Sequence, residues 1–140
     1  MVAIVLLLVS TPAWAGSRYD ELKRVVNRNT GRAHMTRGVN MYTLIALRSC
    51  VTEGDIPVLV TMLADKDHVL QLAAAGVLVD LGAPGRKALE ESAARATDAR
   101  ERMVIRDALQ EAGVPDRRAL KDYPLTERER TSIRGCAKTP

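Results

Sequence analysis

The sequence has no phenylalanine, and its only aromatic residues are Trp14, Tyr19, Tyr42 and Tyr123. Proteins that bind single-stranded nucleic acid by base stacking need exposed aromatic rings, so this scarcity argues against that function. Hydrophobic residues make up 46% of the chain and aromatic residues 3%, so the core must consist of aliphatic side chains. The length of 140 residues fits one domain.

Residues that usually carry catalysis or bind metals are also scarce. His34 and His68 are the only histidines, and Cys50 and Cys136 are the only cysteines. Neither pair has the short spacing that is typical of metal ligands. No phosphate-binding loop, nucleophile elbow or zinc-protease motif occurs. The sequence therefore predicts a protein that is not an enzyme and has no cofactor and no metal site.

Residues 1–15 have the organisation of a signal peptide. Residues 2–9 form an apolar run, Pro12 breaks it, and Ala-Trp-Ala at 13–15 forms a cleavage site. The run is shorter than the roughly 20 apolar residues that span a bilayer. Cleavage after Ala15 predicts a periplasmic or secreted product that is not an integral membrane protein. The run lacks a preceding Lys or Arg, and the alternative is a buried N-terminal helix.

Export would affect the chemistry of the two cysteines. In an oxidising compartment Cys50 and Cys136 are candidates for a disulfide that ties the C-terminal tail to an early helix. The alternative is a buried thiol at Cys50 and an unpaired one at Cys136. The sequence leaves both open because it contains no information on the separation of the two Cα atoms.

The formal charge of +4 is unevenly distributed along the chain. A basic head at 16–38 and a basic tail at 114–140 enclose an acidic centre. The cations of the head are Arg18, Lys23, Arg24, Arg28, Arg32 and Arg37. This pattern is compatible with binding of an anionic ligand by the head, or with simple solvation of helix surfaces. Export argues against chromosomal DNA as a partner.

Two apolar stripes in the middle of the chain have helical spacing. The first is Ile56, Leu59, Val60 and Leu63, and the second is Leu70, Ala74, Val77, Leu78 and Leu81. Residues at i, i+3, i+4 and i+7 lie on one face of a helix, so each stripe predicts a helix with one buried face. Asp67 is placed to cap the second helix, and Gly82 to end it.

A second pair of helices is predicted after Pro84, a residue that suits the first turn of a helix. Its apolar stripes are Ala88, Leu89, Ala93 and Ala96, then Ile105, Ala108, Leu109 and Ala112. Gly82 and Gly113 are 31 residues apart, and Leu78 and Leu109 keep the same offset. The unit therefore recurs in register, as in helical repeat proteins.

Asp-x-Asp at 65–67, the alanines in the following helix and Leu-x-x-Leu-Gly at 78–82 resemble a HEAT repeat. The similarity covers 55–82 well and 84–113 less closely, with a degenerate half-unit at 39–51. Gln71 stands where the family often has arginine, and Arg102 matches in the next unit. The resemblance implies a small exported bacterial protein with a short all-α solenoid of about two to two-and-a-half hairpins. The alternative is an ordinary small helical bundle.

The chain is thus expected to have four parts. These are a signal peptide at 1–15, a basic helix and loop at 16–38, a HEAT-like domain at 39–113 and a basic tail at 114–140. Outside the two full repeats, we expect helices at 17–28, 39–51, 117–123 and 126–133, and a loop at 27–38. The last residues are expected to fray unless Cys136 is bonded.

The HEAT resemblance implies a non-enzymatic module that binds another protein, whose identity the sequence does not reveal. Residues on or next to the inter-helix turns are the candidate contacts, namely Asp65, Lys66, Asp67, Gln71 and Arg102. The same residues could instead cap helices within the repeat. Two other hypotheses remain, an enzyme or enzyme accessory subunit with an unrecognised site, and a basic N-terminal region that binds an anionic ligand.

Overall fold

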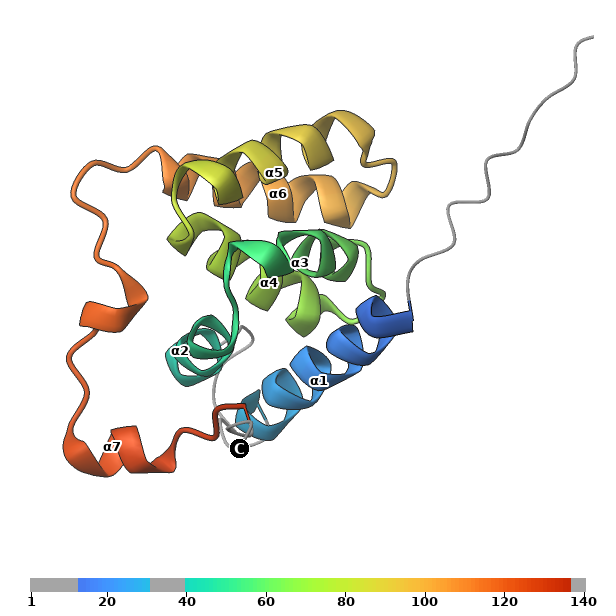
Figure 1. Ribbon diagram of the computed structural model, residues 1–140. Coiled ribbons are helices and arrows are strands. Elements are labelled where there is room, and N and C mark those ends of the chain that lie inside the picture. The colour runs from blue at the N-terminus through green and yellow to red at the C-terminus, as the bar shows by residue number, and fades with distance from the viewer. Residues whose placement is uncertain (1–12, 31–39, 137–140) are drawn as a thin grey trace, which may run out of the picture.

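The structure, a computed structural model, describes residues 13–30 and 40–136, and every regular element in them is helical (Figure 1). The predicted all-α class is therefore confirmed. The α-helices are α1 (Ala13–Thr30), α2 (Met41–Cys50), α3 (Ile56–Leu63), α4 (His68–Asp80), α5 (Ala83–Arg95), α6 (Ala99–Ala112) and α7 (Glu127–Ser132). Two short 3-10 helices, η1 (Glu53–Asp55) and η2 (Leu120–Asp122), lie between them.

Helix α4 is the centre of the fold. Its sequence is apolar on nearly all sides, and a helix of this kind is stable only when other elements surround it. It packs against α1, α2, α3, α5 and α6, and Leu70, Ala74 and Leu78 are fully buried there. Asp67 caps its first turn, because the carboxylate accepts the backbone N–H of Val69 at 2.9 Å. The predicted cap is thus confirmed.

The two predicted helix pairs pack as successive hairpins. Helix α3 pairs with α4, α5 pairs with α6, and α4 contacts both helices of the second hairpin. Gly82 turns the chain between α4 and α5 with a φ of 75°, a conformation that favours glycine. A Cβ atom on Gly85 would overlap the carbonyl oxygen of Leu78. Glycine at this position therefore allows the two hairpins to approach closely.

The buried face of α5 differs from the predicted one. Gly85, Ala88, Leu89 and Ser92 are buried, whereas Ala93 is exposed. The prediction was wrong at Ala93 because alanine occurs on both faces of such a helix and gives a weak signal of burial.

Helix α1 extends further than the sequence predicted. The expected loop begins at Asn27, but the helix continues to Thr30. Side chains stabilise this extension, since Asn29 Nδ2 donates to Val25 O at 2.8 Å and Thr30 Oγ1 donates to Val26 O at 2.7 Å. Helix α1 also includes residues 13–15, on which the predicted cleavage site falls. The rest of that loop, His34 and residues 1–12 lie outside the described residues.

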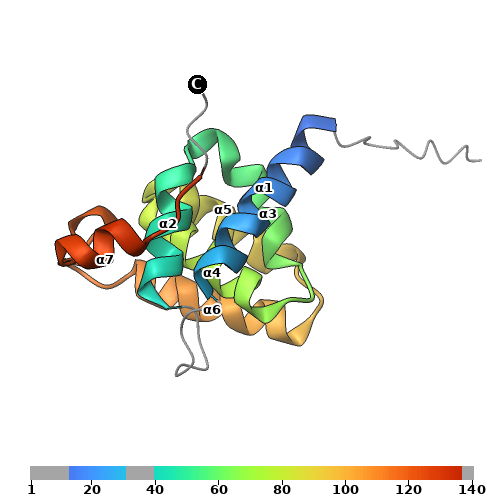
Figure 2. The same ribbon diagram turned by 90° about the horizontal axis from the view of Figure 1, so that it is seen from below.

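The C-terminal segment, residues 114–136, runs from α6 along α2 and ends beside α1 (Figures 1 and 2). The helix predicted at 117–123 is confirmed only in part, because the 3-10 helix η2 forms there over Leu120–Asp122. The helix predicted at 126–133 is confirmed as α7. Leu120 is buried, and Cys136 is covalently linked to Cys50. The segment is therefore anchored at two points along its length.

Candidate functional site

Three of the predicted contact residues close the turn between α3 and α4. Asp65 accepts a hydrogen bond from the Tyr19 hydroxyl and, at 2.8 Å, from the backbone N–H of Asp67. Gln71 is only 2% exposed, and its Nε2 donates to Leu63 O at 2.9 Å. A buried side chain that satisfies a backbone carbonyl stabilises the hairpin and cannot touch a partner. Gln71 is therefore not a surface contact.

The other two predicted residues, Lys66 and Arg102, are exposed. The carbonyl of Lys66 accepts a hydrogen bond from the guanidinium of Arg100, which links the α3–α4 turn to α6. Arg102 lies on the outer side of α6 and lines an open groove. The structure thus brings Asp65, Lys66 and Asp67 together at one turn and places Arg102 on a separate surface.

We define the α5–α6 groove as an open depression of about 860 Å³ on the second hairpin. One lining residue comes from α5 and six come from α6: Ala93, Ala99, Arg102, Met103, Arg106, Leu109 and Gln110. Met103, in the middle of α6, is 46% exposed, so its apolar side chain faces solvent beside the other groove residues. The predicted apolar stripe of α6 did not include Met103, although an apolar residue outside such a stripe is itself a signal of an exposed apolar surface.

The groove lies on the face of α6 opposite the core. At 100° per residue, the groove residues of α6 centre on the side opposite Val104, Ile105 and Ala108, which are buried. Ala93 and Ala99 at its edge are small, so a neighbouring backbone could approach closely. The second hairpin thus buries one face against α4 and exposes a partly apolar face to solvent.

The charged residues of the groove are both arginines, Arg102 and Arg106. Arg106 Nε lies 3.6 Å from Asp107 Oδ1, and both side chains are mostly exposed, so this pair is weak. Glu101, beside Arg102 in sequence, does not line the groove, and burial together with the charge of Asp98 raises its pKa. The groove therefore combines an apolar centre with positive charge.

Asp80, at the end of α4, holds a second polar cluster. Its side chain is 5% exposed and accepts from Arg48 Nε at 2.8 Å, Arg117 Nη1 at 3.2 Å and the Leu120 backbone N–H at 2.8 Å. A cavity of about 500 Å³ borders the cluster. Because these contacts join α2, α4 and the C-terminal segment, the cluster's role is to hold the fold together.

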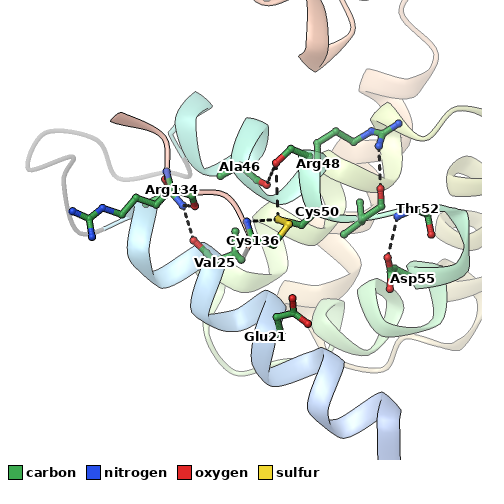
Figure 3. Close-up of a disulfide and its surroundings, with 12 residues drawn as sticks. Glu21, Val25, Ala46, Arg48, Cys50, Thr52, Asp55, Arg134 and Cys136 are labelled. Atoms are coloured by element: carbon green, nitrogen blue, oxygen red, sulfur yellow. Dashed lines mark hydrogen bonds between the residues drawn. A yellow bond between two sulfur atoms is a disulfide. The ribbon is translucent and has the colours of Figure 1, made fainter. Parts of the chain in front are cut away.

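A disulfide links Cys50 at the end of α2 to Cys136, which is one of the two alternatives that the sequence left open (Figure 3). The two Cα atoms are 5.6 Å apart, and Cys136 N–H donates to Cys50 Sγ at 2.8 Å. Asn29 holds the same C-terminal segment in place, because Nδ2 donates to Arg134 O at 2.8 Å and Oδ1 accepts from Arg134 N at 3.1 Å. The tail is thus attached to both α1 and α2.

The cations of the basic head do not form one cluster in the described residues. Arg18 pairs with Asp55 and Glu21, whereas Arg24 and Arg28 are exposed beside a cavity of about 390 Å³. Lys23 is half-buried, and Arg32 and Arg37 lie outside the described residues. Within α1, an anionic ligand could therefore contact fewer exposed cations than the six that the sequence placed in the basic head.

Residues 13–30 and 40–136 contain no cluster of three or more His, Cys, Asp or Glu side chains that could hold a metal ion. His68 Nδ1 lies 3.4 Å from Gln71 Oε1. Within the same ranges no helix is long and apolar enough to cross a membrane.

No protein-family model, curated protein or solved structure matches the chain. Its function must therefore be inferred from its own residues.

Two acidic side chains join α1 to the first hairpin. Arg18 donates to both carboxylate oxygens of Asp55, at 2.9 and 3.0 Å, and this pairing lowers the Asp55 pKa below its ordinary 3.8. The hydrogen bond from Tyr19 lowers the pKa of Asp65 in the same way. Burial, followed by the bond to Asp65, raises the pKa of Tyr19.

We predict that acid weakens the packing of α1. A depressed carboxylate pKa stabilises the folded state above the unfolded pKa, and this stability is lost as pH falls through the folded pKa. The thermal unfolding midpoint, followed by circular dichroism, should therefore drop between about pH 4 and pH 2. The double variant Asp55→Asn/Asp65→Asn should be less stable than the wild type at pH 7, and its unfolding midpoint should fall less as the pH is lowered. An equal fall of the midpoint in the wild type and the double variant would contradict the prediction.

Proposed function

We propose that the protein is a non-enzymatic interaction module that binds another protein through the α5–α6 groove. The observation that carries this proposal is Met103, an exposed apolar side chain in the middle of a groove whose other lining residues include Ala93, Ala99 and Leu109. Exposed apolar patches bordered by polar groups are typical of interaction sites.

We further propose that the two hairpins, in which α4 packs against both α5 and α6, form a short array of the HEAT-repeat kind. In such an array each hairpin buries one face against the preceding unit and the other against the next. Here the face of α6 that would receive the next unit is the one that bears the groove. A binding partner would therefore occupy the place of a missing hairpin.

We also propose that the module acts outside the cytoplasm. The apolar run and Ala-Trp-Ala motif of residues 1–15 have the pattern of a signal peptide. A disulfide between Cys50 and Cys136 suits an oxidising compartment such as the periplasm or the cell exterior. Release of Gly16 as the new N-terminus leaves intact the side-chain contacts from Arg18 onward.

Affinity capture with matched variants tests the proposed surface. The protein from Gly16 onward is immobilised and incubated with the periplasmic or secreted fraction of the cells that produce it. It should recover the same partner protein reproducibly. Met103→Asp should reduce that recovery about tenfold, because the apolar anchor of the proposed interface is replaced by a charged group that binding would have to desolvate. Val114→Asp is the control, since Val114 is also exposed, at 54%, but does not line the groove.

The results of the capture experiment distinguish the α5–α6 groove from the basic side of α1 as the binding surface. Equal recovery by wild type and Met103→Asp would rule out the groove as the binding site. Loss of recovery with Arg24→Glu/Arg28→Glu, but not with Met103→Asp, would place binding on the basic side of α1 instead. Circular dichroism of each variant checks that it remains folded.

A further inference from the structure

We infer that the occupant of the α5–α6 groove is an acidic amphipathic α-helix of the partner, lying along α6 with its carboxylates against Arg102 and Arg106. This inference rests on the proposed function and specifies the chemistry of the partner. It depends on the groove's dimensions, on its charge and on the small number of residues that line it.

The lining residues of α6 extend over the length of a short helix. Its α6 residues run from Ala99 to Gln110, a rise of about 16 Å or three turns. Small side chains at Ala93 and Ala99 allow a helix to pack closely, while Met103 and Leu109 provide apolar contact. A partner helix with apolar residues at i, i+3, i+4 and i+7 would bury them there, as in other helix-in-groove complexes.

The positive charge of the groove favours a partner helix with an acidic sequence. Arg102 and Arg106 are four residues apart, so they lie on the same side of α6. Both guanidinium groups can donate two parallel hydrogen bonds to the oxygens of one carboxylate. Among the described residues Arg106 pairs with Asp107 alone, at 3.6 Å and with both side chains mostly exposed, so a carboxylate of the partner can replace this weak contact. Glutamate residues flanking the apolar stripe of the partner would meet both arginines.

Two other occupants fit the groove less well. A second copy of the chain, paired by a two-fold axis through the groove, would bring Arg102 and Arg106 against their own copies, and like charges repel. The flat face of a globular protein needs roughly 20 to 30 residues on each side for a stable interface. The groove is lined by seven residues, which suits a short helical segment.

Synthetic peptides test the inference by fluorescence anisotropy. The probe is a fluorescein-labelled, amphipathic peptide of about 14 residues, with leucine at i, i+3, i+4 and i+7 and glutamate beside the leucines. One matched peptide has lysine in place of glutamate, and another has the same composition in scrambled order. We expect the acidic amphipathic peptide to bind at least about tenfold more tightly than either.

Charge reversal in the protein provides the second arm. Arg102→Glu/Arg106→Glu should weaken binding of the acidic peptide about tenfold or more and strengthen binding of the lysine peptide. The control is Arg86→Glu, which changes an exposed arginine on α5 outside the groove. A reversal of peptide preference requires direct contact, because a merely destabilised protein would lose both peptides.

Each outcome bears on one of the two proposals. Equal binding of the acidic and scrambled peptides would overturn the inference, since it would show charge attraction without recognition of a helix. Unchanged binding of the acidic peptide to Arg102→Glu/Arg106→Glu would also overturn it. If Met103→Asp still abolished capture of the natural partner, the groove would remain a binding site for a partner of different chemistry. If Met103→Asp had no effect either, the proposed function would fail as well.

Discussion

Replacing Asp80 by alanine is expected to lower the free energy of unfolding by about 3 to 5 kcal/mol. The carboxylate is 5% exposed and is the shared acceptor of Arg48, Arg117 and the Leu120 backbone N–H. Its removal leaves two partly buried guanidinium groups and a backbone donor without this partner. Urea denaturation followed by circular dichroism at pH 7 measures the loss.

Two controls accompany Asp80→Ala. Asp80→Asn keeps the shape and one acceptor oxygen, so we expect it to retain part of the lost stability. Asp107→Ala removes an exposed carboxylate whose pairing with Arg106 is long, and it should change stability by less than about 1 kcal/mol. If Asp80→Ala were as stable as Asp107→Ala, the proposed joining role of the Asp80 cluster would be wrong.

Breaking the Cys50–Cys136 disulfide is the other change with a large expected effect. The bond joins residues 86 positions apart, and closing a loop of this length restricts the unfolded chain strongly. Reduction, or the variant Cys136→Ser, should lower the free energy of unfolding by about 2 to 4 kcal/mol. Thermal unfolding with and without a reductant provides the measurement.

The wild type and Cys136→Ser should differ without reductant and become nearly equal with it. A reductant that also lowers the unfolding midpoint of Cys136→Ser would show an effect unrelated to the disulfide. An unchanged midpoint of the reduced wild type would mean that the noncovalent contacts of Asn29 and Asp80 are sufficient to hold the C-terminal segment. That result would contradict the prediction.

These two contacts act on the same segment, so their effects are not expected to add. Asp80 binds the segment at Arg117 and Leu120, and the disulfide binds it at Cys136. Once one attachment is lost, the segment has more conformational freedom, and the other attachment then contributes less to the stability of its folded position. The α5–α6 groove shares no lining residue with either attachment, so its binding properties can be measured independently of them.

The candidate site was only partly predictable. Asp65, Asp67 and Gln71 were correctly located near a turn, but the structure shows that they form hydrogen bonds within the fold. A turn position exposes some side chains and buries others, and a single sequence does not distinguish them. Met103 could have been noticed because it falls outside the apolar stripe of α6. Its exposure became clear only when the packing of α6 on α4 was known.

The sequence by itself determined the local structure of the central helices. The spacing of apolar residues identified the helices at 56–63 and 68–80, and Asp67 and Gly82 marked the ends of α4. These features are predictable because helical hydrogen bonds, caps and turns involve residues only a few positions apart. The same pattern predicted the all-α class without any tertiary information.

Only the tertiary structure decided which distant residues meet. Asp80 and Arg117 are 37 positions apart, and Asn29 and Arg134 are 105 apart, so no local pattern relates them. The extension of α1 to Thr30 lies in a polar, loop-like sequence, and Asn29 there bonds to the C-terminal segment. The exposed face of α6 likewise depends on which side packs against α4. Contacts of this kind follow from how all the helices fill space together, and a linear sequence does not specify that arrangement directly.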